Sequence, residues 1–259
     1  MNKIALIVVT YQRPELTKIF LDYHKRQQEQ LAKNGYELEL ICVGSEGEVS
    51  RSMATHSGWR YFEFPNNPLS RKVEHGFIKA LEIPGIKGCV WIGSDDFLQY
   101  SLLEYYFKTF SASQEHVHGL SSMYFYSIKR DQTVEYFVHP RCPEKTVGTA
   151  KFYSRRVLDK MDWKICSGRA CNRGVDSYAY REMKKKNITD IPFSMEQSGI
   201  CMDVKAEVSM TNWDMIKGNP CNTVDNSILD NTFGEAMQKI KALRSTVNSE
   251  GLYSIMDKR

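Results

Sequence analysis

The chain has 259 residues, a formal net charge of +4, 42% hydrophobic residues and 25% charged residues. This composition is typical of a globular protein that is long enough to bury a sizeable core. No apolar run approaches the roughly 20 residues of a membrane-spanning helix, and the short apolar start does not read as a signal peptide. The mild positive charge permits an anionic partner but does not require one.

Seven cysteines are scattered along the sequence, and no CxxC pair occurs. Cys42 and Cys89 lie inside apparent core strands, where a free cysteine behaves as a small hydrophobic residue. The odd number and the spacing indicate a reducing, cytoplasmic environment and no zinc site.

The first half of the chain alternates predicted strands and helices. Residues 4–9 form a nearly continuous apolar run of the kind found in parallel sheets. A helix is expected from Pro14, because proline is tolerated in the first helical turn. Two more strands are expected over residues 38–43 and 59–64. Turn residues after residue 64 then end this segment.

A further helix from about Leu69 leads into a fourth strand around Cys89. Its buried face is predicted to carry Val73, Phe77, Ala80 and Leu81. This order predicts an α/β fold with a mostly parallel central sheet and helices on both faces. The carboxyl ends of the four strands should line one crevice, at residues 10–11, 44–48, 66–67 and 94–96.

The second half is less regular and predicts a smaller antiparallel and helical part. No linker or internal repeat interrupts it, so we expect a single domain over residues 1–259. The expected elements are a hairpin of residues 117–128 and 133–138, a strand within 148–153 before a helix from Ser154, a helix over 175–186, a strand over 200–208 and a last helix within 224–247.

The most informative feature is the pair Asp95 and Asp96, which directly follows the apolar strand around Cys89. Two ionised carboxylates cannot enter the core without a large desolvation cost, so they must lie at the strand's carboxyl end. Ligands bind at that end of open α/β sheets. A carboxylate pair suits a hard divalent cation such as Mn²⁺ or Mg²⁺. The alternative is a solvated turn or a helix cap.

Together with three other motifs, this pair resembles the GT-A-fold glycosyltransferases of the large inverting family two, over about residues 3–208. The motifs are residues 7–14, residues 66–76, residues 93–96, and Gly148 with Asp176. The resemblance implies a Rossmann-like nucleotide-diphospho-sugar transferase fold and metal-dependent, inverting transfer of a sugar to an acceptor hydroxyl. It divides the domain into a nucleotide-sugar-binding half (1–98), an acceptor-side half (99–220) and a C-terminal helical extension (221–259).

For the donor, the resemblance implies that the loop after the first strand contacts the nucleotide. Thr10 lies in this loop, Tyr11 would stack on the base, and Arg13 would face phosphate. A plain strand-to-helix turn capped by Thr10 is the alternative. Glu46 is a single acidic residue where the family usually carries two, so the identity of the nucleotide's base stays open.

Arg71 and Lys72 lie at the start of the third helix, which the family places beside the nucleotide sugar. Free backbone N–H groups, the helix dipole and two cations would favour an anion there. The alternative is a solvated helix face.

Ser94, Asp95 and Asp96 match the family's DxD-type element, with serine in place of the first acid. The resemblance makes Asp96 the metal ligand, while Ser94 and Asp95 lie at the ribose or the sugar. The family often adds a late histidine as a ligand, but none occurs after His139.

Asp203, Asn212 or water are the candidates to replace that histidine. On the acceptor side, Gly148 would let the backbone approach the donor sugar. Asp176 matches the catalytic base, which takes the acceptor hydroxyl's proton during attack on C1. As an alternative, Asp176 caps a helix.

The acceptor stays open, as does the oligomeric state. The chain resembles members that bacteriophages encode, which suggests the host cytoplasm and a hydroxymethylated pyrimidine in DNA as acceptor. Basic residues with aromatic residues between them fit a phosphate backbone. They are Lys151, Arg155, Arg156, Trp163, Lys164, Arg169, Arg173, Tyr178, Tyr180, Arg181 and Lys184 to Lys186.

Three alternatives remain. One is a saccharide or a cell-surface glycan precursor as acceptor. The second is a module that binds a nucleotide sugar without catalysis. The third is a nucleotidyltransferase, which the absence of a glycine-rich loop after the first strand disfavours.

Overall fold

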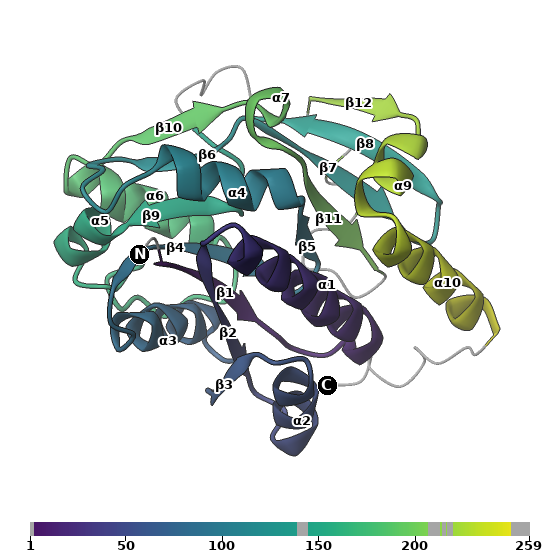
Figure 1. Cartoon of the computed structure of the whole chain (residues 1–259), viewed down its shortest axis with the longest axis horizontal. Helices are drawn as coiled ribbons and strands as arrows, with labels where there is room; N and C mark the ends of the chain where they lie inside the picture. The colour runs from purple at the N-terminus through teal and green to yellow at the C-terminus, as the bar shows by residue number, and fades with distance from the viewer. Residues whose placement is uncertain (1–2, 139–144, 207–212, 214–215, 217–219, 250–259) are drawn as a thin grey trace.

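The computed structural model describes residues 3–138, 145–206, 213, 216 and 220–249. A seven-stranded sheet forms the centre of the molecule (Figure 1). All neighbouring strands in it are parallel except the two pairs that β9 makes with β4 and β6. Its order is β10 (Asp190–Phe193), β6 (Val117–Leu120), β9 (Lys151–Ser154), β4 (Ile86–Gly93), β1 (Lys3–Val9), β2 (Glu37–Gly44) and β3 (Arg60–Glu63).

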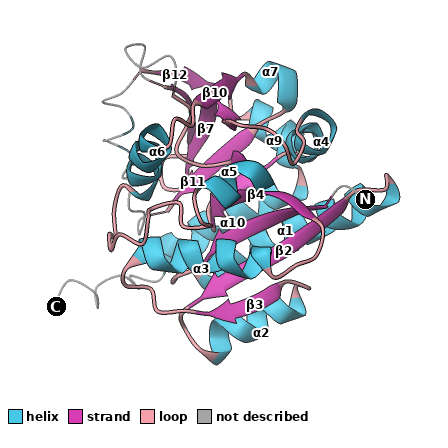
Figure 2. Cartoon of the chain, turned by 90° about the vertical axis from the view of Figure 1, so that its left-hand side faces the viewer, coloured by secondary structure: helices cyan, strands magenta, loops and turns pink. Residues whose placement is uncertain are grey.

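Helices cover both faces of this sheet (Figure 2). Alternate side chains of β1 point to opposite faces, as the pleat of a strand requires. Leu6 therefore packs in one buried cluster with Phe20, and Ile7 packs in another with Phe77. The first cluster lies under α1 (Pro14–Lys33), α2 (Glu48–His56) and α4 (Tyr100–Thr109), and the second lies under α3 (Leu69–Leu81), α5 (Arg155–Lys160) and α6 (Val175–Lys185). The expected α/β fold is confirmed.

A second sheet carries the smaller, mostly antiparallel part. In it only β11 and β7 run parallel. Its order is β12 (Cys221–Val224), β8 (Gln132–Phe137), β7 (Ser122–Ser127), β11 (Cys201–Lys205) and β5 (Asp96–Leu98).

The expected hairpin is confirmed for β7 and β8, but the run from residue 117 feeds two sheets. The chain divides at Ser121, whose N–H donates to the carbonyl of Phe193 and whose carbonyl accepts from Val138. Of this run, β6 before Ser121 therefore belongs to the central sheet, and β7 after it belongs to the second sheet.

Two further expectations were wrong in detail. The last helix is two helices, α9 (Ser227–Phe233) and α10 (Glu235–Ser249), because Gly234 has a φ of 50°, which glycine adopts at no steric cost. Leu81 is 39% exposed and lies outside the buried face of α3.

A further short helix is α7 (Met195–Ser198), and α10 packs along α1 (Figure 1). None of the helices in the described ranges combines the length and apolar character that a membrane crossing requires.

Candidate functional site

The acidic pair lies at the junction of the two sheets. β4 of the central sheet ends at Gly93, and β5 of the second sheet begins at Asp96. Asp96 is only 5% exposed. Its Oδ2 accepts hydrogen bonds from the Gly93 N–H and the Thr149 hydroxyl, both at 2.7 Å. The pair thus lies where the parallel strands end, as the sequence predicted.

A third carboxylate, that of Asp203, joins this pair. Asp203 lies directly opposite Asp96 in the antiparallel ladder of β11 and β5. One carboxylate oxygen from each of Asp95, Asp96 and Asp203 can be chosen so that all lie within 4.8 Å of one another. The Oδ1 of Asp203 is buried and has no hydrogen-bond partner among the described residues. We call these three residues the acidic cluster. Its ligand chemistry fits a hard divalent cation. Asn212 lies outside the described residues.

Two cations of the chain flank the acidic cluster. Arg13 Nη1 donates to Asp95 Oδ2 at 2.6 Å, and its Nη2 donates to the Ser94 hydroxyl at 3.3 Å. Lys205 Nζ donates to Asp203 Oδ2 at 2.5 Å. Sequence reasoning missed Lys205. The two-residue period of a strand was the available signal, because it places Asp203 and Lys205 on one face of β11.

Burial and the neighbouring charges shift the pKa values of the three carboxyl groups of the acidic cluster in different directions. Burial, and then the carboxylates of Asp203 and Asp95, raise the pKa of Asp96 well above its ordinary value. Burial raises the pKa of Asp203 to about 6, although the Lys205 charge opposes this. Burial also disfavours the ionised form of Asp95, but the charges of Arg13 and Lys205, together with the hydrogen bond from Arg13, outweigh burial and lower the pKa of Asp95. A bound divalent cation would favour the ionised form of all three carboxylates.

Lys72 does not lie on the surface of α3 but inside the protein, where it is fully buried. Its Nζ donates to the Thr10 carbonyl at 2.5 Å, the Ser45 hydroxyl at 2.9 Å and Asn66 Oδ1 at 3.2 Å. Burial lowers the pKa of Lys72 to about 8. Lys72 therefore ties together the ends of β1, β2 and β3, three of the four predicted strand ends.

The start of α3 differs from the open helix end that the sequence suggested. The N–H of Leu69 donates to Asn172 Oδ1 at 2.8 Å, and the N–H of Ser70 donates to the Cys171 carbonyl at 3.0 Å. These two N–H groups are thus satisfied within the chain. The exposed Arg71 lies next to them, with Nη1 3.8 Å from Glu74 Oε2.

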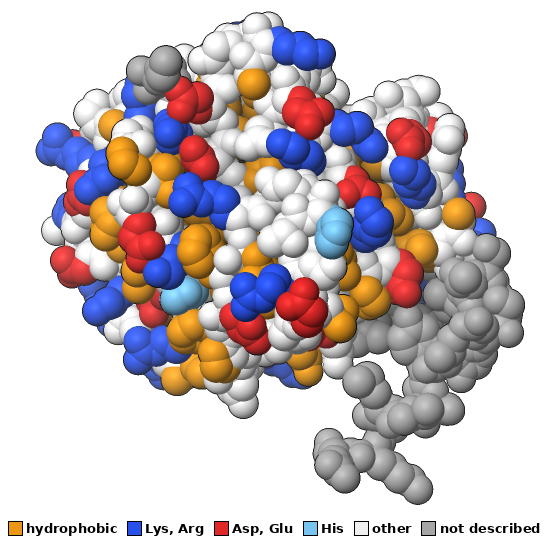
Figure 3. Space-filling view, turned by 60° about the horizontal axis from the view of Figure 1, so that its bottom comes forward, with side chains coloured by type: hydrophobic (Ala, Val, Ile, Leu, Met, Phe, Trp, Pro, Cys, Tyr) orange, Lys and Arg blue, Asp and Glu red, His pale blue; other side chains and the backbone are white. Residues whose placement is uncertain are grey.

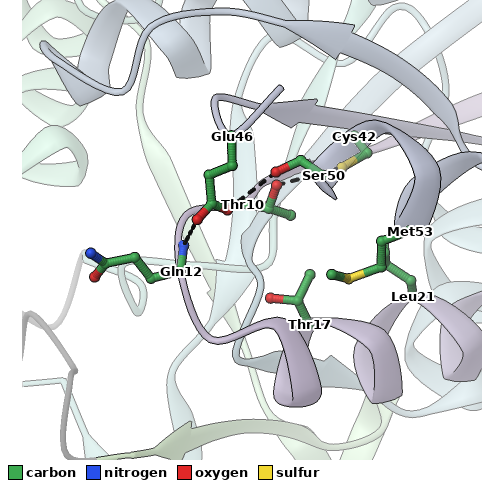
Figure 4. A pocket seen from close by; sticks show the side chains of 8 residues that line it. All are labelled: Thr10, Gln12, Thr17, Leu21, Cys42, Glu46, Ser50 and Met53. Carbon is green, nitrogen blue, oxygen red and sulfur yellow. Dashed lines mark hydrogen bonds between the residues drawn. The ribbon is translucent and has the colours of Figure 1, made fainter. Parts of the chain in front are cut away.

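Two of the predicted nucleotide residues, Thr10 and Glu46, line a small hollow between β1, β2, α1 and α2 (Figure 4). Glu46 accepts hydrogen bonds from the Gln12 N–H and the Ser50 hydroxyl, each at 3.1 Å. Thr10 also lines this hollow, and its Oγ1 lies 3.8 Å from the Cys42 sulfur inside the core. Tyr11, which follows Thr10, keeps 45% of its surface exposed. An exposed aromatic residue thus lies in the chain between Thr10 and Gln12, two residues that line the hollow with Glu46.

Gly148 and Asp176 are neighbours in space. A Cβ atom at Gly148 would lie 3.0 Å from Asp176 Oδ2. Asp176 is partly exposed at the second position of α6, and its side chain forms no hydrogen bond within the described part of the chain. Thr149 follows Gly148 and bonds Asp96, so one loop links Asp176 to the acidic cluster.

No protein-family model matches the sequence, and no curated protein matches it. Solved structures of similar fold include a mutant of Drosophila beta-1,4-galactosyltransferase 7 in complex with manganese, UDP-Gal and xylobiose. It is 11% identical, over 91% of this chain and 76% of that one, with a TM-score of 0.47.

S. aureus TarS (residues 1–349) is 13% identical, over 78% of this chain and 60% of that one, with a TM-score of 0.48. A 4-diphosphocytidyl-2C-methyl-D-erythritol synthase is 12% identical, over 74% of this chain and 88% of that one, with a TM-score of 0.45. Likenesses at this level say nothing about the substrate of this chain.

Proposed function

We propose that the protein is a metal-dependent, inverting glycosyltransferase that moves a sugar from a nucleotide-diphosphate sugar to an acceptor hydroxyl. The observation that carries this proposal is the acidic cluster at the sheet junction, linked through Gly148 and Thr149 to Asp176. The order of the four motifs in the sequence supports the same class.

The donor is bound at the carboxyl ends of the parallel strands. The exposed ring of Tyr11 stacks on the base, and Glu46, with Thr10 beside it, receives the base's N–H groups. Arg13 faces the phosphate groups of the donor. It also bonds Asp95 and Ser94 and so orients Asp95 toward the ribose or the sugar. Arg71 is exposed and contacts the diphosphate.

Lys72 is a positioning residue in this scheme. It is buried and has three acceptors within the chain, which keep the strand ends in register beneath the ring of Tyr11, 5.9 Å from its centroid.

Asp96 and Asp203 would hold the divalent cation, Mn²⁺ or Mg²⁺. The Oδ1 of Asp203, which has no hydrogen-bond partner among the described residues, fits the role of the missing late histidine. When bound, the cation neutralises the negative charge that develops on the diphosphate leaving group. The Gly93 N–H and the Thr149 hydroxyl orient Asp96 for this task.

Asp176 is the catalytic base. Its carboxylate is partly exposed and engages no donor among the residues that the structure describes, so it can accept the proton of an acceptor hydroxyl as that oxygen attacks C1. The absence of a side chain at Gly148 leaves room for the donor sugar beside Asp176.

For the acceptor we propose a hydroxymethylated pyrimidine in DNA. Arg169 and Arg181 are exposed and both lie near Tyr178 of α6, with guanidinium carbons 4.4 and 5.3 Å from the ring centroid. Guanidinium groups held against an aromatic ring are well suited to phosphate. Among the described residues, the face shown in Figure 3 carries no comparable cluster of basic side chains, because acidic and basic side chains are interspersed on it.

The experiment compares wild type with Asp176→Asn, with Ser177→Ala as a matched control on the same turn of α6. Release of nucleoside diphosphate from a panel of nucleotide sugars is measured with Mn²⁺ and either hydroxymethylated DNA or oligosaccharides. We expect Asp176→Asn to lose roughly 10²- to 10⁴-fold in turnover and the control to keep it. Equal turnover by wild type and Asp176→Asn would refute the assignment of the base. Turnover only with oligosaccharides would replace the acceptor and leave the reaction class intact.

A further inference from the structure

Lys205 lies against the acidic cluster without a role in the scheme above. Its side chain is only 8% exposed, and that of its partner Asp203 only 13%. The ammonium group lies 5.0 Å from the centroid of the Phe125 ring and donates to Asp203 Oδ2. A buried ion pair of this kind is costly to desolvate and is weak evidence of a purely stabilising role.

The ion pairs of the acidic cluster leave little charge for a free metal ion. Arg13 engages Asp95, and Lys205 engages Asp203, while among the described residues Asp96 receives hydrogen bonds from the neutral donors Gly93 and Thr149. Even with all three carboxylates ionised, the two cations leave only one net negative charge. A divalent cation that uses Asp203 must therefore share this carboxylate with the lysine ammonium or displace it.

We infer that Lys205 is an internal counter-ion that competes with the divalent cation for Asp203. It weakens binding of the free ion and makes tight binding depend on the donor. The diphosphate supplies oxygen ligands to the metal and an alternative partner for the ammonium group. By linkage, the metal and the diphosphate then strengthen each other's binding by the same factor. This inference rests on the proposed function, since it takes the donor to be a nucleotide-diphosphate sugar.

The test measures the affinity for Mn²⁺ alone, by electron paramagnetic resonance of the free ion, in wild type and in Lys205→Met. Methionine is close to lysine in length and carries no charge. We expect Mn²⁺ to bind at least tenfold more tightly to Lys205→Met than to wild type. Lys108→Met, which removes an exposed ion-paired lysine on α4, is the control and should bind as wild type does.

A second variant covers the case in which Lys205→Met does not fold, because it leaves Asp203 without its counter-ion. Lys205→Gln keeps a hydrogen-bond donor and should give the same gain. A Lys205→Met protein that folds only when Mn²⁺ is added would also support the inference. Unchanged or weaker Mn²⁺ binding by the folded variants would overturn it.

The result is separate from the transfer reaction. A gain in Mn²⁺ affinity without consumption of any nucleotide sugar would leave the competition by Lys205 intact and remove the proposed function. Consumption of a nucleotide sugar without a gain in Mn²⁺ affinity would leave the proposed function intact and overturn the competition by Lys205.

Discussion

Replacing Lys151 should expose how the loop at the site is anchored. Lys151 and Asp190 form a buried ion pair, with side chains only 7% and 0% exposed. Oδ2 of Asp190 accepts from Lys151 Nζ at 2.8 Å, and from the N–H and hydroxyl of Thr146 at 3.2 and 2.8 Å. Its Oδ1 has no partner among the described residues. This network fixes both ends of the loop that carries Gly148 and Thr149.

The substitution Lys151→Met leaves the carboxylate of Asp190 buried without its counter-ion. Breaking a buried pair in this way costs about 3 to 5 kcal/mol of unfolding free energy. For a chain of this size the melting temperature should fall by roughly 6 to 20 °C. Urea unfolding followed by circular dichroism measures the free energy, and a thermal scan measures the melting temperature.

Two further variants separate charge from packing. Lys164→Met removes an exposed lysine and should leave the stability within about 0.5 kcal/mol of wild type. Adding Asp190→Asn to Lys151→Met removes the buried charge and should restore at least half of the loss. A loss below about 1 kcal/mol in Lys151→Met would refute this account of the anchor.

Two other predictions concern pH and the acceptor side. Burial lowers the pKa of His24 to about 3, so the folded protein keeps it neutral, while the unfolded chain protonates near 6.5. The contribution of His24 to the unfolding free energy is therefore fully present above pH 6.5. It decreases as the pH falls below 6.5, by roughly 2 kcal/mol at pH 5. His24→Gln should remove that share of the acid sensitivity in urea titrations, and the exposed His56→Gln should not; equal behaviour would contradict the assignment. Gly148→Ala brings a methyl group against Asp176 and should lower turnover roughly tenfold or more with little change in melting temperature, whereas full turnover would refute the contact.

The strands β1 to β4 of the central sheet could be predicted from the sequence because their signals are local, whereas β6, β9 and β10 could not be assigned to this sheet. Continuous apolar runs, Pro14 at a helix start, and turn residues after each strand fix the elements and their order without knowledge of the tertiary contacts. The acidic pair was placed correctly for the same reason, since desolvation forbids it inside the strand.

The rest depends on contacts between distant segments. The helix start at Leu69 is satisfied by Asn172, which lies 103 residues later. Nothing near Lys72 in the sequence shows that it turns inward to three strand ends. The third carboxylate, Asp203, becomes part of the cluster only through the ladder of β11 and β5.

The most direct test of the account is binding of the donor together with the metal. Thermal unfolding of wild type and Asp96→Asn is recorded with a panel of nucleotide-diphosphate sugars, with and without Mn²⁺. For wild type we predict that one donor, at about 100 times its dissociation constant, raises the melting temperature by roughly 5 to 10 °C only when Mn²⁺ is present. Asp96→Asn should lose this rise. The absence of a rise with every donor, or an equal rise in Asp96→Asn, would contradict the acidic cluster as the centre of a nucleotide-sugar site.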